Sequence, residues 1–489
     1  MTEQGGSVCR TAVVQAAGTR PGIGGRRGGG TRLRGATRPG HATGPRAATR
    51  PAGAARPAGG GTVTTAPARP AGTGVARPPA PAAAPRKGGL TGRPALLLLA
   101  SLIVALLAAS AAPTPLYAIY QARWGFTPIT TTIVFGVYAV AVLASLLTLG
   151  KLSDHVGRRP VLLAALGVQA VTLLVFATAG GVPALLIARV VQGLATGAAL
   201  GAIGAGLLDV DRERGTFANA VAPGMGTGSG VLLSALAVRY LPAPTHLIYL
   251  ALMGVFVIQA AGVVLLRETV TRTPGALSSL RPEIRLPRAL RGPVLTATPV
   301  LFAVWALGGL YGALGPALVH ALTGSLDVVL GGLSLFVLTA AAVITIIALR
   351  AASPRIVMLT GILCLITGAA VTMLGLGITS TPLFFAGTAI SGAGFGSGFQ
   401  GSIRTVVPRA AAHERAGVLS LLYIVSYLGL GVPAVVAGFV IVHGGGLTGT
   451  ALFYGGAVIL LATLALPGLL RGQTAFPATA RADKLDRAV

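Results

Sequence analysis

One basic side chain lies well inside a long apolar run of this sequence. It is Arg189, in the order Arg189-Val-Val-Gln192-Gly193. A guanidinium in apolar surroundings is costly, and it normally faces a cavity or a polar partner through which it binds an ion or moves a proton. Because Arg189 is close to the start of its run, its long side chain could instead extend to the polar boundary. The sequence leaves both interpretations open.

A short polar segment, Gly150 to Pro160, joins two other apolar runs. Its order is Gly-Lys-Leu-Ser-Asp-His-Val-Gly-Arg-Arg-Pro, and such charges cannot lie in hydrocarbon, so a tight loop at one membrane face is expected. Gly157 permits a positive φ, and Pro160 suits the first turn of the next helix. We expect Asp154 to cap that helix or to face the N-terminus of another one, where the helix dipole favours a carboxylate. A plain basic hairpin is the alternative.

Aromatic and amide side chains inside the apolar runs are candidates for a solute path. Any one of them is more often a packing residue or an interface anchor. The candidates that we retain are Tyr117, Tyr138, Trp305, Tyr311 and Gln400.

Acids and cysteines are too scattered to form a metal site or an enzyme centre. Cys9 and Cys364 have no nearby partner in the sequence, so neither a disulfide nor a metal cluster is expected, and we expect no metal and no cofactor. A membrane transferase would need clustered acids or histidines in aqueous loops, so we do not expect an enzyme. The acids at or near the ends of apolar runs are Asp154, Asp209, Asp327 and Glu268.

The bulk composition is that of a membrane protein. The chain has 489 residues, of which 53% are hydrophobic and 10% charged, with a mean hydropathy of +0.79. Soluble domains are about 25% charged. Long apolar runs follow one another from Pro94 onward, which predicts a polytopic membrane protein.

The net charge of +27 is concentrated outside the apolar runs. Fifteen of the 38 basic residues lie in residues 1–93, against one acid, Glu3. This segment is rich in Arg, Pro, Gly and Ala without an apolar period, so we predict a disordered cytoplasmic tail rather than a signal peptide. The interpretation that we favour is that this tail only holds the N-terminus in the cytoplasm; the alternatives are binding to anionic lipid headgroups or weak contact with nucleic acid. Because it has no aromatic residues for stacking on bases, we expect no specific nucleic-acid partner.

Twelve spans of roughly 20 residues are predicted, the length that crosses a bilayer. They are 94–118, 129–149, 161–179, 182–207, 217–238, 246–266, 293–315, 326–349, 355–376, 382–406, 417–440 and 448–470. The longest polar interval separates six spans from six. The expected domains are therefore an N-terminal six-helix bundle at 94–266, a cytoplasmic central loop at 267–292, a C-terminal six-helix bundle at 293–470 and a cytoplasmic tail at 471–489.

The basic residues between spans predict the orientation. With the N-terminus inside, the cytoplasmic loops hold sixteen Lys and Arg residues, whereas the opposite side holds Arg123 and Arg239. The positive-inside rule then places both termini in the cytoplasm.

A weak internal repeat relates the two sets of six spans. Gly193-Leu-Ala-Thr-Gly197 matches Gly394-Phe-Gly-Ser-Gly398 at an offset of 201 residues, and the same offset carries Glu213 onto Glu414. An offset of six spans keeps the orientation, so the repeat is parallel, with two bundles around a central cavity.

The polar segment between the second and third spans resembles the signature loop of the major facilitator superfamily of secondary transporters. The resemblance covers about residues 94–470. It implies an all-α membrane protein of 12 transmembrane helices in two parallel-repeat six-helix bundles, with both termini cytoplasmic. In that family the loop latches the two halves on the cytoplasmic side, and we expect Asp154 to meet the start of the eleventh span near 416–418. The positions that match the latch are Gly150, Asp154, Gly157, Arg158 and Arg159.

Two further motifs match in part. Arg189-x-x-Gln192-Gly193 resembles the fourth-helix motif that is implicated in coupling in proton-linked members. The fifth span, with its Pro-Gly-Met-Gly order, partly resembles the Gly-Pro-rich motif of the antiporters. Their small residues also allow close helix approach, and proline bends a helix. The residues for which we expect a packing role are Gly193, Gly197, Pro223 and Gly224.

The resemblance implies a multi-pass cell-membrane transporter that moves a small organic solute by alternating access. We expect a monomer in the lipid bilayer, with a small-molecule substrate and protons as partners, working as a proton-coupled exporter. The first span lacks the acid that many proton-linked drug exporters carry, which leaves the coupling ion open. The alternatives are uptake of a sugar or organic anion, or a non-transport membrane protein such as a channel or scaffold.

Overall fold

The regular secondary structure of the described residues is helical. The computed structural model describes residues 89–411 and 413–471. Within these residues there is no strand, and an isolated parallel bridge pairs Leu90 with Leu266. Residues 1–88 of the predicted basic tail lie outside the described residues. Residues 472–489 of the predicted C-terminal tail lie outside them as well.

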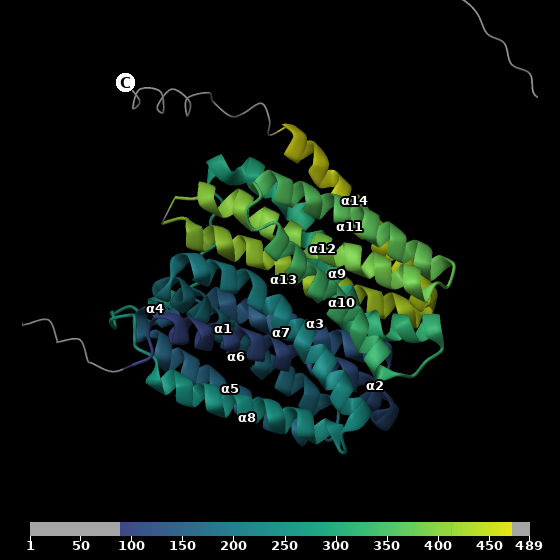
Figure 1. Ribbon diagram of the computed structural model, residues 1–489, viewed down its shortest axis with the longest axis horizontal. Helices are drawn as coiled ribbons and strands as arrows, with labels where there is room; N and C mark the ends of the chain where they lie inside the picture. Colours follow the sequence, from purple (N-terminus) through teal and green to yellow (C-terminus); the bar gives the residue numbers. More distant parts are fainter. Residues whose placement is uncertain (1–88, 412, 472–489) are drawn as a thin grey trace, which may run out of the picture. The chain divides into compact units, whose positions relative to one another are not determined.

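Long helices account for every predicted span (Figure 1). The long helices are α1 (Gly92–Ala111) followed directly by α2 (Pro113–Trp124), α3 (Pro128–Thr148), α5 (Arg158–Ala177), α6 (Val182–Val210), α7 (Arg212–Tyr240), α8 (Pro244–Leu265), α9 (Arg291–Thr323), α10 (Val328–Ala348), α11 (Pro354–Gly377), α12 (Thr381–Val406), α13 (Arg415–Val440) and α14 (Leu447–Arg471). The short helices between them are α4 (Leu152–Val156), η1 (Ser278–Leu280), η2 (Arg288–Leu290), η3 (Val407–Arg409) and η4 (Ile441–Gly445).

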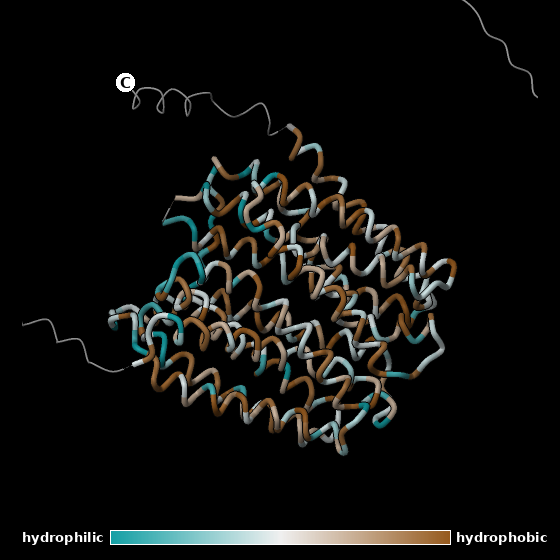
Figure 2. Tube along the Cα trace, viewed as in Figure 1, coloured by the Kyte–Doolittle hydropathy of each residue, from teal (hydrophilic) through white to brown (hydrophobic). Residues whose placement is uncertain are grey.

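The hydropathy of these helices confirms an all-α membrane fold. In the described part of the chain, eleven helices are long and apolar enough to cross a membrane. The predicted span 382–406 corresponds to α12, which has 26 residues but is rich in glycine and serine and is not among these eleven. Figure 2 shows hydrophobic residues along the helices and hydrophilic ones gathered mainly at their ends.

The first span differs from its prediction. The predicted span ends at residue 118, but the helical segment continues as α2 to Trp124. Ala112, between the two helices, has φ −54° and ψ −37°, so the backbone stays in the helical region across the junction. We call this junction before Pro113, where proline interrupts the helical hydrogen bonds, the kink of the first span. The first position of a helix needs no hydrogen-bonded N–H, and proline has none. A new helix can therefore begin at Pro113.

The buried hydrophobic side chains of the described residues form two separate cores. One core consists of buried residues of α1 to α8, between Ala95 and Leu266. The other consists of buried residues from Leu290 to Ala465, together with Ala111 and Val231. We call α1 to α8 the first half and α9 to α14 the second half. Each half thus buries its own apolar side chains.

The two halves meet along two seams, α3 against α13 and α7 against α10. Glycines permit close approach there: a Cβ at Gly431 would lie 3.4 Å from Cβ of Ala139, and one at Gly228 would lie 2.6 Å from Oγ1 of Thr339. We call the end of the helices at which α4 lies the α4 end. Because α3 runs toward α4 and α13 starts at that end, the glycine contacts of the α3–α13 seam lie in the middle and at the opposite end.

Candidate functional site

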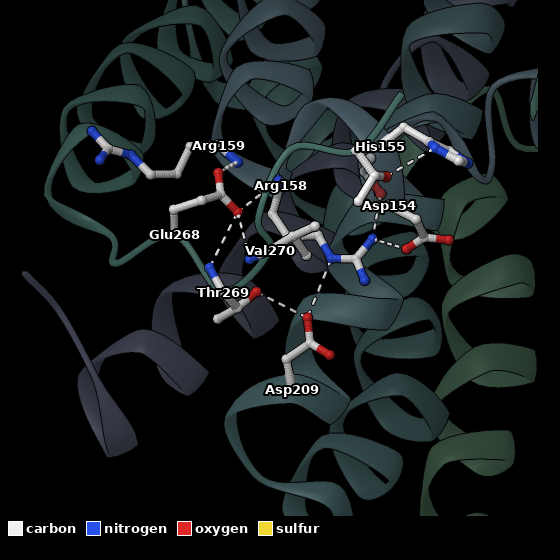
Figure 3. A network of polar contacts seen from close by, with 10 residues as sticks. Asp154, His155, Arg158, Arg159, Asp209, Glu268, Thr269 and Val270 are labelled. Atoms are coloured by element: carbon white, nitrogen blue, oxygen red, sulfur yellow. Dashed lines mark hydrogen bonds and ion pairs between the residues drawn. The ribbon is translucent and has the colours of Figure 1, made fainter. Parts of the chain in front are cut away.

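A network of charged side chains surrounds α4 (Figure 3). Its centre is Arg158, which is 7% exposed. The Arg158 guanidinium forms an ion pair with Asp154, donates to Oγ of Ser153 at 2.6 Å, and lies 3.3 Å from Oδ2 of Asp209 at the end of α6. One arginine therefore joins α4, α5 and α6 within the first half.

Glu268 caps α5. Its carboxylate accepts the backbone N–H of Arg158 at 2.9 Å and that of Arg159 at 3.0 Å, where the helix dipole favours a negative charge. We had expected Asp154 as a candidate for this cap. Gly157 has φ +109° as predicted, and a Cβ there would lie 2.8 Å from the Glu268 carboxylate. The sequence signal for Glu268 was its position directly after a span and among basic residues.

Asp154 is turned toward its own half. Its described ion-pair partner is Arg158, and its side chain is 52% exposed. The start of α13, where Asp154 is expected, is contacted instead by Arg285 of the central segment, whose backbone N–H donates to the carbonyl of Gly417 at 3.5 Å.

The same central segment also contacts the α4 loop. Lys151 Nζ lies 2.7 Å from Oε2 of Glu283, and this hydrogen bond lowers the pKa of the Glu283 carboxyl. The pair is therefore intact at neutral pH and is lost as the pH falls below the usual range of a carboxyl. The Thr273 hydroxyl lies 3.1 Å from Nδ1 of His155. Residues 267–290 thus connect the α4 loop with α13.

Arg189 forms a second site, inside the first half. It is 1% exposed, so its side chain stays inside rather than reaching the polar boundary. Its Nε and Nη2 donate to the Tyr117 hydroxyl at 2.9 and 2.6 Å, and its Nη1 donates to Oε1 of Gln192 at 2.6 Å. The guanidinium carbon lies 5.2 Å from the ring centre of Tyr138 and 5.5 Å from that of Phe176. Its described partners are neutral groups and aromatic faces, which stabilise a cation.

Arg189 and Gln192 satisfy the backbone at the kink of the first span. Pro113 has no N–H, so the carbonyl of Ala109 has no partner within the helix. Gln192 Nε2 donates to that carbonyl at 3.2 Å, and Arg189 Nη1 donates to the carbonyl of Ser110 at 2.9 Å. The predicted coupling pair is therefore bonded to the one break in the first span.

The structure does not bring the predicted path residues together in one place. Tyr117 and Tyr138 lie beside Arg189, and the Tyr138 hydroxyl donates to Oγ of Ser110 at 2.7 Å. Tyr311 points into the second half, where its hydroxyl lies 2.9 Å from Oγ1 of Thr388. A cavity of about 10 Å³ beside Tyr311 has room for about one water molecule. Gln400 is buried at 9% exposure.

Trp305 lies in an aromatic cluster that the sequence did not indicate. Its ring centre is 6.3 Å from that of Phe395, 5.7 Å from that of Phe399 and 5.1 Å from that of Tyr427. We call these four residues the Trp305 cage. They come from α9, α12 and α13, which the sequence alone does not bring together.

The predicted packing residues lie at helix contacts. A Cβ at Gly193 would lie 2.6 Å from Cβ of Ala141, and one at Gly197 would lie 2.6 Å from Cβ of Ser145, so α6 packs directly on α3. A Cβ at Gly224 would lie 2.6 Å from Cγ2 of Val343, on the seam with α10. Pro223 lies inside the continuous helix α7.

Acids in the described part of the chain lie in loops or at helix ends. Asp211 and Asp327 cap α7 and α10 through their side chains. Asp209 is in the last turn of α6, and Glu213 is in the first turn of α7. No cluster of His, Cys, Asp and Glu that could hold a metal ion is found among the residues described.

Comparisons with known proteins agree with this architecture. Residues 97–366 match the sequence profile of the Major Facilitator Superfamily. No curated protein matches the sequence. Among solved structures, a variant of the nucleoside transporter NupG is similar with a TM-score of 0.60 and 14% identity, and the similarity covers 76% of this chain and 99% of that one. The human organic anion transporter MFSD10 (TETRAN) is similar with a TM-score of 0.56 and 18% identity, over 76% of this chain and 99% of that one. At these identities the likeness shows the fold.

Proposed function

Because this chain belongs to the Major Facilitator Superfamily, a family of membrane transporters, we propose that it exports a small organic solute across the cell membrane in exchange for protons. Transport occurs by alternating access, in which the two halves rock about a site between them. The protein works as a monomer, and both termini lie in the cytoplasm.

The bonding of Arg189 and Gln192 to the kink of the first span carries this proposal. A buried cation held by neutral acceptors is sensitive to any added charge nearby, because the surroundings screen it weakly. A proton or an anion that reaches this site changes the hydrogen bonds to the carbonyls of Ala109 and Ser110. Occupancy of the site is thereby linked to the angle between α1 and α2.

The arrangement of the halves supports alternating access. Each half has its own core, so the halves can rotate as units. The glycine contacts of the α3–α13 seam lie away from the α4 end. With the α4 end in the cytoplasm, as its basic residues favour, this is the state closed toward the outside. In the opposite state Asp154 leaves Arg158 and latches onto α13.

Uptake of an organic anion or a sugar is the second candidate. The observation in its favour is that Arg189 carries the one full charge inside the described membrane helices, away from their ends. The similar solved structures bear the names of a nucleoside transporter and an organic anion transporter.

Flux measurements in proteoliposomes test the proposal. The vesicles carry an imposed pH gradient and a trapped pH dye, and cationic dyes, antibiotics, sugars and organic acids are added one at a time. We expect one class of compound to dissipate the gradient, with the sign of export. Arg189→Ala abolishes the proton movement, whereas the exposed Arg239→Ala does not.

The same assay separates the alternatives. Solute flux without proton movement would mean a facilitator or another coupling ion, and the opposite sign would mean uptake. Asp154→Asn reduces flux although the protein inserts normally. Normal flux of a folded Asp154→Asn protein would refute the latch.

A further inference from the structure

The Trp305 cage has an unused hydrogen-bond donor. Nε1 of Trp305 is buried and has no acceptor among the described residues. A buried N–H without a partner costs roughly 1–3 kcal/mol. All four cage residues are nevertheless partly exposed, so the cluster is not sealed inside the second half. The cage thus combines aromatic surface with a donor that needs an acceptor.

The cage lies on the surface that the second half turns toward the first. On α9, Trp305 shares a helix face with Gly312, seven residues on, where a Cβ would lie 2.9 Å from the ring of Phe135 in α3. On α13, Tyr427 lies one turn before Gly431, which packs on Ala139 of α3. Both cage residues are displaced from these contacts toward the α4 end. The cage therefore lies where the closed part of the α3–α13 seam ends.

The charge on the other side of the seam is positive. Tyr138 precedes Ala139 on α3, and its ring centre lies 5.2 Å from the Arg189 guanidinium carbon. The described acids lie in loops or at helix ends, so none of them offsets Arg189 inside the membrane. Aromatic faces alone attract cations. A fixed positive charge in a medium of low dielectric opposes them.

We propose that the Trp305 cage binds the aromatic ring of the transported compound, and that this compound is uncharged or anionic and accepts a hydrogen bond from Trp305 Nε1. This inference rests on the proposed transport function and names the substrate class of its site. The ring packs among Phe395, Phe399 and Tyr427, and the acceptor group, a carbonyl or a carboxylate, satisfies the indole N–H.

Tryptophan fluorescence tests this proposal directly. The chain has two tryptophans, Trp124 and Trp305. Trp124 stacks on Tyr120 in α2, outside the cage, so the Trp124→Phe protein leaves Trp305 as the sole emitter. Three probes that share a biphenyl group and differ in charge are titrated into this protein in lipid nanodiscs: biphenyl-4-carboxylate, biphenyl-4-carboxamide and (biphenyl-4-ylmethyl)trimethylammonium.

We expect the carboxylate and the amide to change the Trp305 emission in a saturable way. The ammonium compound binds at least about ten-fold more weakly, which corresponds to about 1.4 kcal/mol. Trp305→Phe keeps a ring but removes the N–H, and in calorimetric titration it weakens binding of the amide by roughly 2- to 10-fold. Thermal unfolding of each variant confirms that it is folded.

Equal or tighter binding of the ammonium compound overturns the proposal, and so does the absence of a saturable change with all three probes. Saturable binding without solute flux in proteoliposomes would refute the proposed transport function, while the binding role of the cage would still stand. Flux of a cationic solute while Trp305 emission stays unchanged would refute the binding role of the cage, while the proposed transport function would still stand.

Discussion

Glu268 shows how one carboxylate can organise a loop. It accepts backbone N–H groups of Arg158, Arg159, Thr269 and Val270, two of them at the start of α5. The first N–H groups of a helix have no partner within it, so an acceptor at this place is worth more than one on an exposed surface. The bonded carboxylate also joins the end of α8 to the loop around α4.

Replacement of this carboxylate is expected to destabilise the first half. Glu268→Gln removes the negative charge at the start of α5 and costs about 1–2 kcal/mol. Thermal unfolding in detergent measures the loss as a lower midpoint. Glu213→Gln, in the exposed first turn of α7, is the matched control and changes the midpoint less. Equal effects of the two variants would contradict the capping role.

At the level of the helices, the positions of glycine determine which pairs of helices can pack with their backbones in close contact. The glycines of α7 face two neighbours: Gly226 and Gly230 lie against α1, whereas Gly224 and Gly228 lie against α10. One helix thereby packs within its own half and across the seam. Small residues on both faces allow this in a membrane, where the hydrophobic effect does not drive helices together.

An added methyl group on α7 tests this packing. A Cβ at Gly230 would overlap the backbone of Ala108, so Gly230→Ala forces α7 away from α1 and destabilises the protein by about 1–3 kcal/mol. Gly254→Ala on α8, where a Cβ meets nothing within 4 Å, is expected to be neutral or stabilising by up to about 1 kcal/mol. Comparison of the two midpoints of thermal unfolding checks the prediction. A destabilised Gly254→Ala with an unchanged Gly230→Ala would contradict it.

At the scale of the whole described unit, two cores meet along two seams, and transport by rocking needs the α3–α13 seam to open. A covalent bond across that seam should therefore stop transport. Ala139 and Gly431 are suited to the test, because the Cβ–Cβ distance of 3.4 Å at this pair is close to the usual 3.5–4.5 Å of disulfides.

The double variant Ala139→Cys/Gly431→Cys, with Cys9 and Cys364 replaced by Ser, is expected to form this bond on oxidation. Flux in proteoliposomes then falls to the background level and returns after reduction. Each single-cysteine variant serves as a control and keeps its flux under oxidation. Undiminished flux of the cross-linked protein would contradict opening at this seam.

Local sequence patterns were sufficient to predict the membrane class, the number of spans and the family. Span length, the place of charges and the order Gly150 to Pro160 are local properties of the chain, and they can be read without knowing any contact. The predicted spans correspond to the observed helices, although the first continues through its proline kink to Trp124. The predicted orientation rests on the same local charges.

Which side chains meet could not be predicted from such patterns, because the meeting residues are far apart in the sequence. Glu268 reaches Arg158 from 110 residues away, and Arg189 reaches the carbonyl of Ser110 from 79 residues away. The Trp305 cage draws on three helices, and no sequence pattern indicated that its three other rings meet Trp305. Such contacts depend on how helices rotate and pack against each other, a choice made by shape and glycine position over the whole bundle rather than by any local pattern.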